Sequence, residues 1–104
     1  MSIPLPIEVS DLADEQIRKE DAWWRQNRLK APNAIREELE RVSSLIAFQP
    51  GIGARARNVR LPGVRRIHIE RIHIKLYYRA VGSPPQYVEI VAFWGSRRGI
   101  GPPI

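Results

Sequence analysis

The sequence has 104 residues, 43% of them hydrophobic, and no cysteine, which predicts one domain over residues 1–104 with one modest core and excludes disulfides and thiolate metal sites. With only two histidines, no secretion signal and no apolar run near the roughly 18 residues that cross a bilayer, we expect a cytoplasmic protein without metal or cofactor. The net charge of +6 is uneven: residues 1–50 carry seven basic against nine acidic residues and residues 51–104 ten against two, so the second half should attract phosphate backbones or an acidic protein.

The first predicted elements are a strand and a helix. The apolar run 5–9 contains a proline and follows another, which is typical of an edge strand because proline cannot donate to a β-ladder. Ser10 or Asp11 can then cap a helix over about residues 12–29, in which the Trp23–Trp24 pair is the main apolar anchor.

A second helix is expected from Pro32 to about residue 48. Its hydrophobic residues recur at i, i+4, i+7 and i+11, as Ile35, Leu39, Val42 and Ile46. Gln49-Pro50-Gly51 ends it. The short connection predicts an antiparallel helical hairpin that packs on one face of a sheet.

Residues 64–98 predict a three-stranded antiparallel meander. Apolar residues alternate on one face, at Ile67, Ile69, Ile72, Ile74, Leu76 and Tyr78. The other face is mostly basic, with Arg66, His68, Glu70, His73, Lys75, Tyr77 and Arg79. Turns are expected at 70–71 and 82–85, and the third strand, 87–94, is apolar on both faces and therefore interior, with Trp94 in the core.

These elements define an α+β fold. We expect an N-terminal strand, an α-helical hairpin and then the meander, with the helices on one face of a four-stranded sheet. Gly51 and Gly53 are interpreted as turn residues, since a phosphate-binding loop would lead into a helix rather than a strand. Residues 99–104 contain two glycines and two prolines and should form an irregular tail that lies over the domain or frays.

Several short motifs follow one another in a recognisable order. They are Trp24, Ala31-Pro32, Glu37-Glu38-Leu39, Gln49-Pro50-Gly51-Ile52-Gly53, Val64-Arg65-Arg66, Leu76-Tyr77-Tyr78-Arg79 and Trp94-Gly95-Ser96-Arg97-Arg98-Gly99. The ordered set, over about residues 7–102, resembles the ParE/RelE superfamily of toxins from bacterial type II toxin–antitoxin modules, which includes plasmid-stabilisation proteins. The resemblance implies a toxin that a cognate antitoxin keeps inactive.

The branches of this superfamily differ in activity. RelE-like members are ribosome-dependent messenger-RNA endoribonucleases, whereas characterised ParE-like members inhibit DNA gyrase. Many RelE-like nucleases carry a catalytic Tyr or a His-Tyr pair near the C-terminus, but residues 99–104 contain no acid–base group here. The Arg97-Arg98 pair is instead similar to the ParE-like branch, so a gyrase-binding toxin is the leading hypothesis. A basic binding module without toxic activity is a third.

The alternative, an endoribonuclease, needs a base for the 2′-hydroxyl, cations for the phosphorane and an acid for the leaving oxygen. Its candidate residues are His68, His73, Lys75, Tyr77 and Arg79. Histidine suits acid–base roles because its ordinary pKa is near 6.5. A surface role is the simpler interpretation for both histidines.

For a toxin that acts by binding, the exposed cations of the sheet matter more. The candidates for contact with the target or the antitoxin are Arg65, Arg66, Lys75, Arg79, Arg97 and Arg98. Arg97 and Arg98 are the strongest of these, because they follow the last strand and should be exposed.

Overall fold

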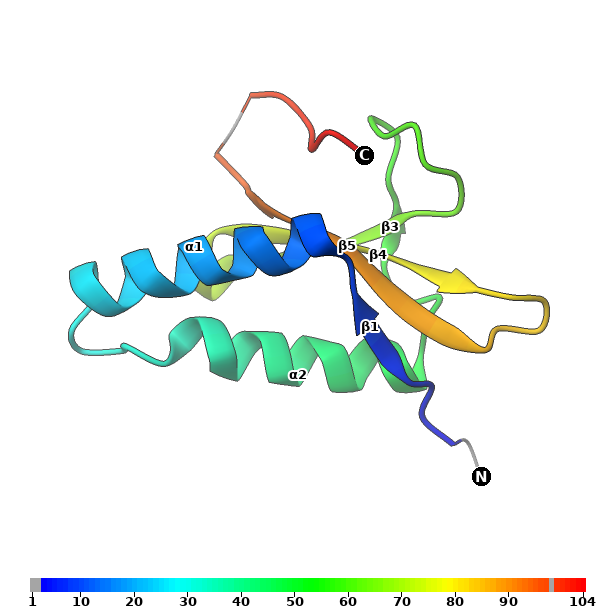
Figure 1. The fold of residues 1–104 in the computed structure, drawn as a ribbon, viewed down its shortest axis with the longest axis horizontal. Coiled ribbons are helices and arrows are strands. Elements are labelled where there is room, and N and C mark those ends of the chain that lie inside the picture. The colour runs from blue at the N-terminus through cyan, green and yellow to red at the C-terminus, as the bar shows by residue number, and fades with distance from the viewer. Residues whose placement is uncertain (1–2, 98) are drawn as a thin grey trace.

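The computed structural model describes residues 3–97 and 99–104 and arranges them as two helices against a sheet (Figure 1). The elements in chain order are β1 (Ile7–Val9), α1 (Asp11–Asn27), α2 (Ala34–Phe48), β2 (Ala54–Arg55), β3 (Arg65–Ile69), the 3-10 helix η1 (Glu70–Ile72), β4 (Ile74–Val81) and β5 (Tyr87–Gly95). The strand order in the sheet is β1-β5-β4-β3-β2.

The helices form the expected antiparallel hairpin, seen side by side in Figure 1. α1 begins where the Ser10 side chain accepts a hydrogen bond of 3.1 Å from the amide of Ala13, the N-cap contact that the sequence predicted. α2 buries Ile35, Val42 and Ile46 completely, which confirms its predicted apolar face. Within the described residues, neither helix is long and apolar enough to cross a membrane.

The sheet contains the predicted meander and one strand more than expected. β3, β4 and β5 pair antiparallel, η1 occupies the predicted turn, and β5 is interior because β1 pairs with it in parallel. The expectation of four strands was wrong, since β2 adds a fifth at the edge of β3. β2 has only two residues, too few for an alternating pattern to reveal.

A β-bulge at Val91 changes which residues of β5 share a face. Tyr77 is opposite Ala92 while Tyr78 is opposite Ile90, so Val91 is the additional residue. Ile90 and Phe93 consequently belong to one apolar cluster and Ala92 to another.

The larger cluster, called here the main core, lies between the sheet and the helices. Its buried members include Ile35, Ile46, Ile74, Tyr78, Ile90 and Phe93, and the partly buried Leu39 and Ile67 pack against it. The predicted shared interior of helices and meander is therefore confirmed.

The opposite face of the sheet carries a second cluster, so the expectations of one core and of an open basic face were wrong. Val64, Tyr77, Val91 and Ala92 are buried there, and Trp94 is half-buried against them instead of in the main core. Residues 56–61 and the tail supply the cover: the Arg60 amide donates to the Ile104 carbonyl at 2.7 Å, and Trp94 Nε1 donates to the Ile100 carbonyl at 2.8 Å. The predicted irregular tail thus packs on the sheet.

Candidate functional site

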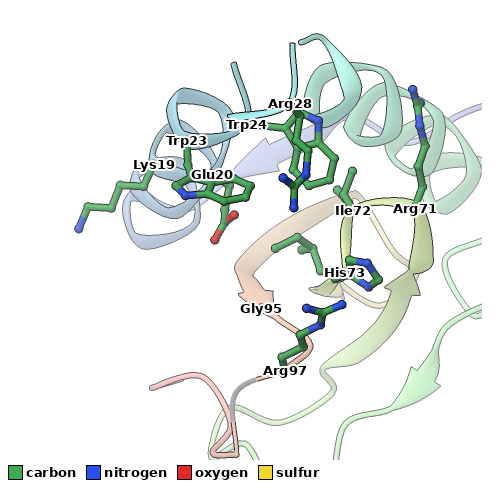
Figure 2. A pocket seen from close by; sticks show the side chains of 11 residues that line it. Lys19, Glu20, Trp23, Trp24, Arg28, Arg71, Ile72, His73, Gly95 and Arg97 are labelled. Carbon is green, nitrogen blue, oxygen red and sulfur yellow. The ribbon is translucent and has the colours of Figure 1, made fainter. Parts of the chain in front are cut away.

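A pocket of about 690 Å³ lies between the second half of α1 and the chain around η1 and the end of β5 (Figure 2). It is lined by Lys19, Glu20, Trp23, Trp24, Arg28, Arg71, Ile72, His73, Ile74, Gly95 and Arg97. This size and mixed lining are typical of sites that bind a ligand or an anchoring side chain. We call it the Trp/Arg pocket.

Helical periodicity explains the α1 wall. Glu20 and Trp24 are four residues apart and share one face of α1, and Arg28 follows as the residue that caps the end of the helix. Trp24 is buried against the main core, whereas 46% of Trp23 is exposed. The exposed part of the Trp23 indole gives the pocket an apolar surface.

Arg28 lies over both indoles. The two rings meet edge to face with centroids 6.0 Å apart, and the Arg28 Cζ is 5.0 Å from the Trp23 centroid and 5.8 Å from that of Trp24. Such cation–π contacts stabilise by about 0.5–1 kcal/mol when exposed. They fix the guanidinium beside an apolar surface, and Figure 2 shows it extending into the space between the walls.

The opposite wall depends on His73. Its φ of 55° is in the left-handed region, which is uncommon for a residue other than glycine, and it terminates η1 before β4 starts. The His73 carbonyl accepts a hydrogen bond of 2.8 Å from the Ser96 amide, which ties this turn to the end of β5. His73 and Arg97 therefore line the same side of the pocket, as Figure 2 shows.

Arg71 joins this wall to α2. Its guanidinium contacts a carboxylate oxygen of Glu37 at 3.1 Å and one of Glu38 at 3.3 Å. The hydrogen bonds to these two carboxylates raise the pKa of Arg71, and the bond to Glu37 has the larger effect. Glu38 is buried, and a hydrogen bond from Arg41, followed by that from Arg71, lowers the pKa of Glu38. The charge of Arg71 is thus neutralised on the scaffold side.

The cations left to the pocket are Arg28 and Arg97. Lys19 pairs with Glu15 at 3.1 Å and points away from the pocket in Figure 2. Arg97 makes no hydrogen bond or ion pair with any residue that the structure describes. An indole floor with two guanidinium groups at its rim fits a partner that presents an apolar side chain next to a carboxylate or phosphate.

The candidate nuclease residues are divided between the second face of the sheet and the Trp/Arg pocket. His68 is directly opposite Lys75 on the second face of the sheet, but Tyr77 beside them is only 5% exposed under the second cluster. Arg79 is held at 3.0 Å by Glu89, and His73 is in the Trp/Arg pocket instead. Among residues 3–97 and 99–104, no three His, Asp or Glu side chains gather as metal ligands would.

The candidate binding residues are also divided. Arg65 donates to the Gly53 carbonyl at 2.7 Å, and Arg66 is paired across β3 and β4 with Tyr77 on the second face. Arg97 is exposed in the pocket, as the sequence predicted, whereas Arg98 lies outside the described residues. The sequence interpretation missed Trp23, Trp24 and Arg28 as site residues, because the pocket forms only where their segment meets residues 71–74 and 95–97 in the folded chain.

The fold and the pocket define a small α+β protein with an aromatic and cationic pocket between its first helix and its sheet. A family model described as the ParE toxin of the type II toxin–antitoxin system, parDE, matches residues 7–99. The chain therefore belongs to the ParE toxin family, which confirms the resemblance found in its motifs.

The fold is also similar to a solved structure titled as the chromosomal ParDE TA system from P. aeruginosa. The TM-score is 0.68 at 19% identity, over 88% of this chain and 95% of that chain. At this identity the likeness establishes a shared fold. A comparison with curated protein sequences finds no match.

Proposed function

We propose that this ParE-family toxin acts in the cytoplasm by binding a protein target, DNA gyrase, and that a cognate antitoxin neutralises it by occupying the Trp/Arg pocket. The observation that carries the proposal is the position of Arg97, which has no carboxylate partner among the described residues and lines the wall of the pocket opposite the exposed Trp23. Antitoxin and target then compete for one surface.

The chemistry of the pocket selects an acidic segment with an apolar anchor. Trp23 offers exposed apolar surface backed by the buried Trp24, while Arg28 and Arg97 can each donate hydrogen bonds to a carboxylate. A disordered segment that folds on binding loses conformational entropy, so it needs a few deep contacts of this kind to bind tightly.

The positions of the nuclease candidates support binding over cleavage. General acid–base catalysis requires the two groups to lie within hydrogen-bonding reach of the same substrate. Burial of Tyr77, pairing of Arg79 and the separation of His73 from the His68–Lys75 pair leave no such set assembled here.

A supercoiling assay with purified gyrase tests the proposal. The full chain should inhibit supercoiling, Arg97→Ala should weaken inhibition at least about tenfold, the scale of one charged contact, and Arg36→Ala should leave it unchanged. Arg36 is a fair control because it is an exposed arginine outside the pocket. Full supercoiling at saturating toxin would contradict gyrase as the target.

A further inference from the structure

The hairpin formed by β2, β3 and their connection is the most cationic segment of the chain. Residues 53–66 contain five arginines and no acidic residue: Arg55, Arg57, Arg60, Arg65 and Arg66. In Figure 1 this green segment extends from the sheet on the side away from the helices.

The arginines elsewhere are largely paired with carboxylates, and those of the hairpin are not. Ion pairs join Arg18 to Asp14, Arg25 and Arg36 to Asp21, Arg41 and Arg71 to Glu38, and Arg79 to Glu89. In the part of the chain that the structure describes, the guanidinium groups of Arg55, Arg57, Arg60 and Arg66 have no hydrogen bond or ion pair.

Two of the hairpin cations also face each other. Arg55 of β2 is directly opposite Arg65 of β3, and like charges in this relation destabilise a pair of strands. The carbonyl of Gly53 accepts a hydrogen bond from Arg65, but a carbonyl does not cancel the charge. A bound polyanion would remove this repulsion.

Strand alternation distributes the charges around the hairpin. Arg66 is on the face of the sheet that carries the second cluster, since it is opposite Tyr77, while Arg55 and Arg65 are on the other face. Arg57 and Arg60 are exposed in the connection. The apolar residues of the connection, Val59 and Leu61, pack into the second cluster instead of outward.

We propose that this hairpin binds the phosphate backbone of duplex DNA without reading its sequence, in addition to the proposed binding of gyrase. Arg55 lies on the edge strand β2, and Arg57 and Arg60 are exposed in the connection that follows it, so these guanidinium groups can contact successive phosphates along a duplex.

Other polyanions fit the hairpin less well. Single strands are bound on aromatic platforms, and residues 53–66 contain no aromatic side chain. An acidic protein would need apolar anchors at the centre of its interface, but the hairpin turns these inward.

Fluorescence anisotropy with a short labelled duplex, without gyrase or antitoxin, tests this inference independently of the proposed function. The full chain should bind the duplex more tightly than a single strand of equal length or poly-glutamate. The triple variant Arg55→Gln, Arg57→Gln, Arg60→Gln should lose at least about tenfold in affinity and flatten the plot of log K against log salt by roughly 2–3 units.

A charge-matched control separates the hairpin from net charge. Arg18→Gln, Lys30→Gln, Arg36→Gln removes the same charge from exposed helical and loop positions and should bind within about twofold of the parent, since bound phosphates rather than net charge set the affinity. The variant Arg55→Lys, Arg57→Lys, Arg60→Lys keeps the charge and should retain most of the slope of log K against log salt. Thermal unfolding of each variant checks that it is folded.

Three results would overturn the inference: duplex binding unchanged in the triple glutamine variant, equal losses in the hairpin and control variants, or equal affinity for the duplex and poly-glutamate. None of these depends on whether gyrase is the target.

Discussion

The hydroxyl oxygen of Tyr78 accepts a hydrogen bond of 2.8 Å from the amide of Gly53. The same hydroxyl donates to the carbonyl of Pro50 at 2.7 Å. A side chain in the centre of β4 thus holds the segment that leads from α2 to β2, and this contact explains the glycine at position 53.

Gly53→Ala should destabilise the fold by about 3 kcal/mol, because an added Cβ would lie 2.7 Å from the Tyr78 hydroxyl and 2.9 Å from the Arg66 carbonyl. Chemical denaturation measures the free energy of unfolding. Gly51→Ala is the control, since nothing lies within 4 Å of its added Cβ. Equal effects at both positions would show that the Tyr78 contact does not matter.

Tyr78→Phe should cost about 1–3 kcal/mol by leaving the buried Gly53 amide without its acceptor. Burial raises the pKa of Tyr78 above 10.0. The contribution of Tyr78 to the free energy of unfolding is therefore fully present below about pH 10 and is lost as the pH rises through the raised pKa. The phenylalanine variant should lose less stability than the parent in this alkaline range, and parallel alkaline curves would contradict this account.

The contribution of Glu38 to stability should be lost toward acidic pH, whereas that of Tyr78 is lost toward alkaline pH. Hydrogen bonds from Arg41 and Arg71 lower the pKa of Glu38 below 4.5, so its contribution is present above that pH and lost as the pH falls through the lowered value. Glu38→Gln should cost about 1–2 kcal/mol at neutral pH and flatten the acid limb of the stability curve. Glu40→Gln, at an exposed position, is the control and should change neither the stability at neutral pH nor the acid limb. Thermal unfolding between acidic and neutral pH measures both effects.

The secondary structure could be predicted from the sequence where the spacing of the apolar residues is regular. Ile35, Val42 and Ile46 repeat at helical spacing, and Ile67, Ile74 and Leu76 alternate as strand residues, so the helical hairpin and the meander were predictable. The bulge at Val91 was not predictable, because residues 90–93 are all apolar and no alternation between the two faces can be read from them.

The Trp/Arg pocket was harder to foresee for a different reason. Its walls come from residues 19–28, 71–74 and 95–97, and their meeting depends on how α1 crosses the sheet and on the left-handed His73. The surface patterns of separate segments contain no such information. Arg97 was predictable because it simply follows the last strand.

Removal of residues 100–104 should destabilise the protein by about 1–3 kcal/mol, since it uncovers Tyr77 and Val91 and removes the hydrogen bond to Trp94. The chain should stay folded because the main core contains no tail residue. Urea denaturation measures the loss, with the exposed Pro103→Ala as control. Complete unfolding of the shortened chain would show that the two clusters are not independent.

We propose that this ParE-family toxin acts by binding gyrase and not by cutting RNA. The most direct measurement is to induce the chain in cells and follow plasmid supercoiling and the integrity of messenger RNA in the same culture. We predict loss of supercoiling or double-strand breaks while messages stay intact. Rapid cleavage of messages with supercoiling preserved would contradict the account.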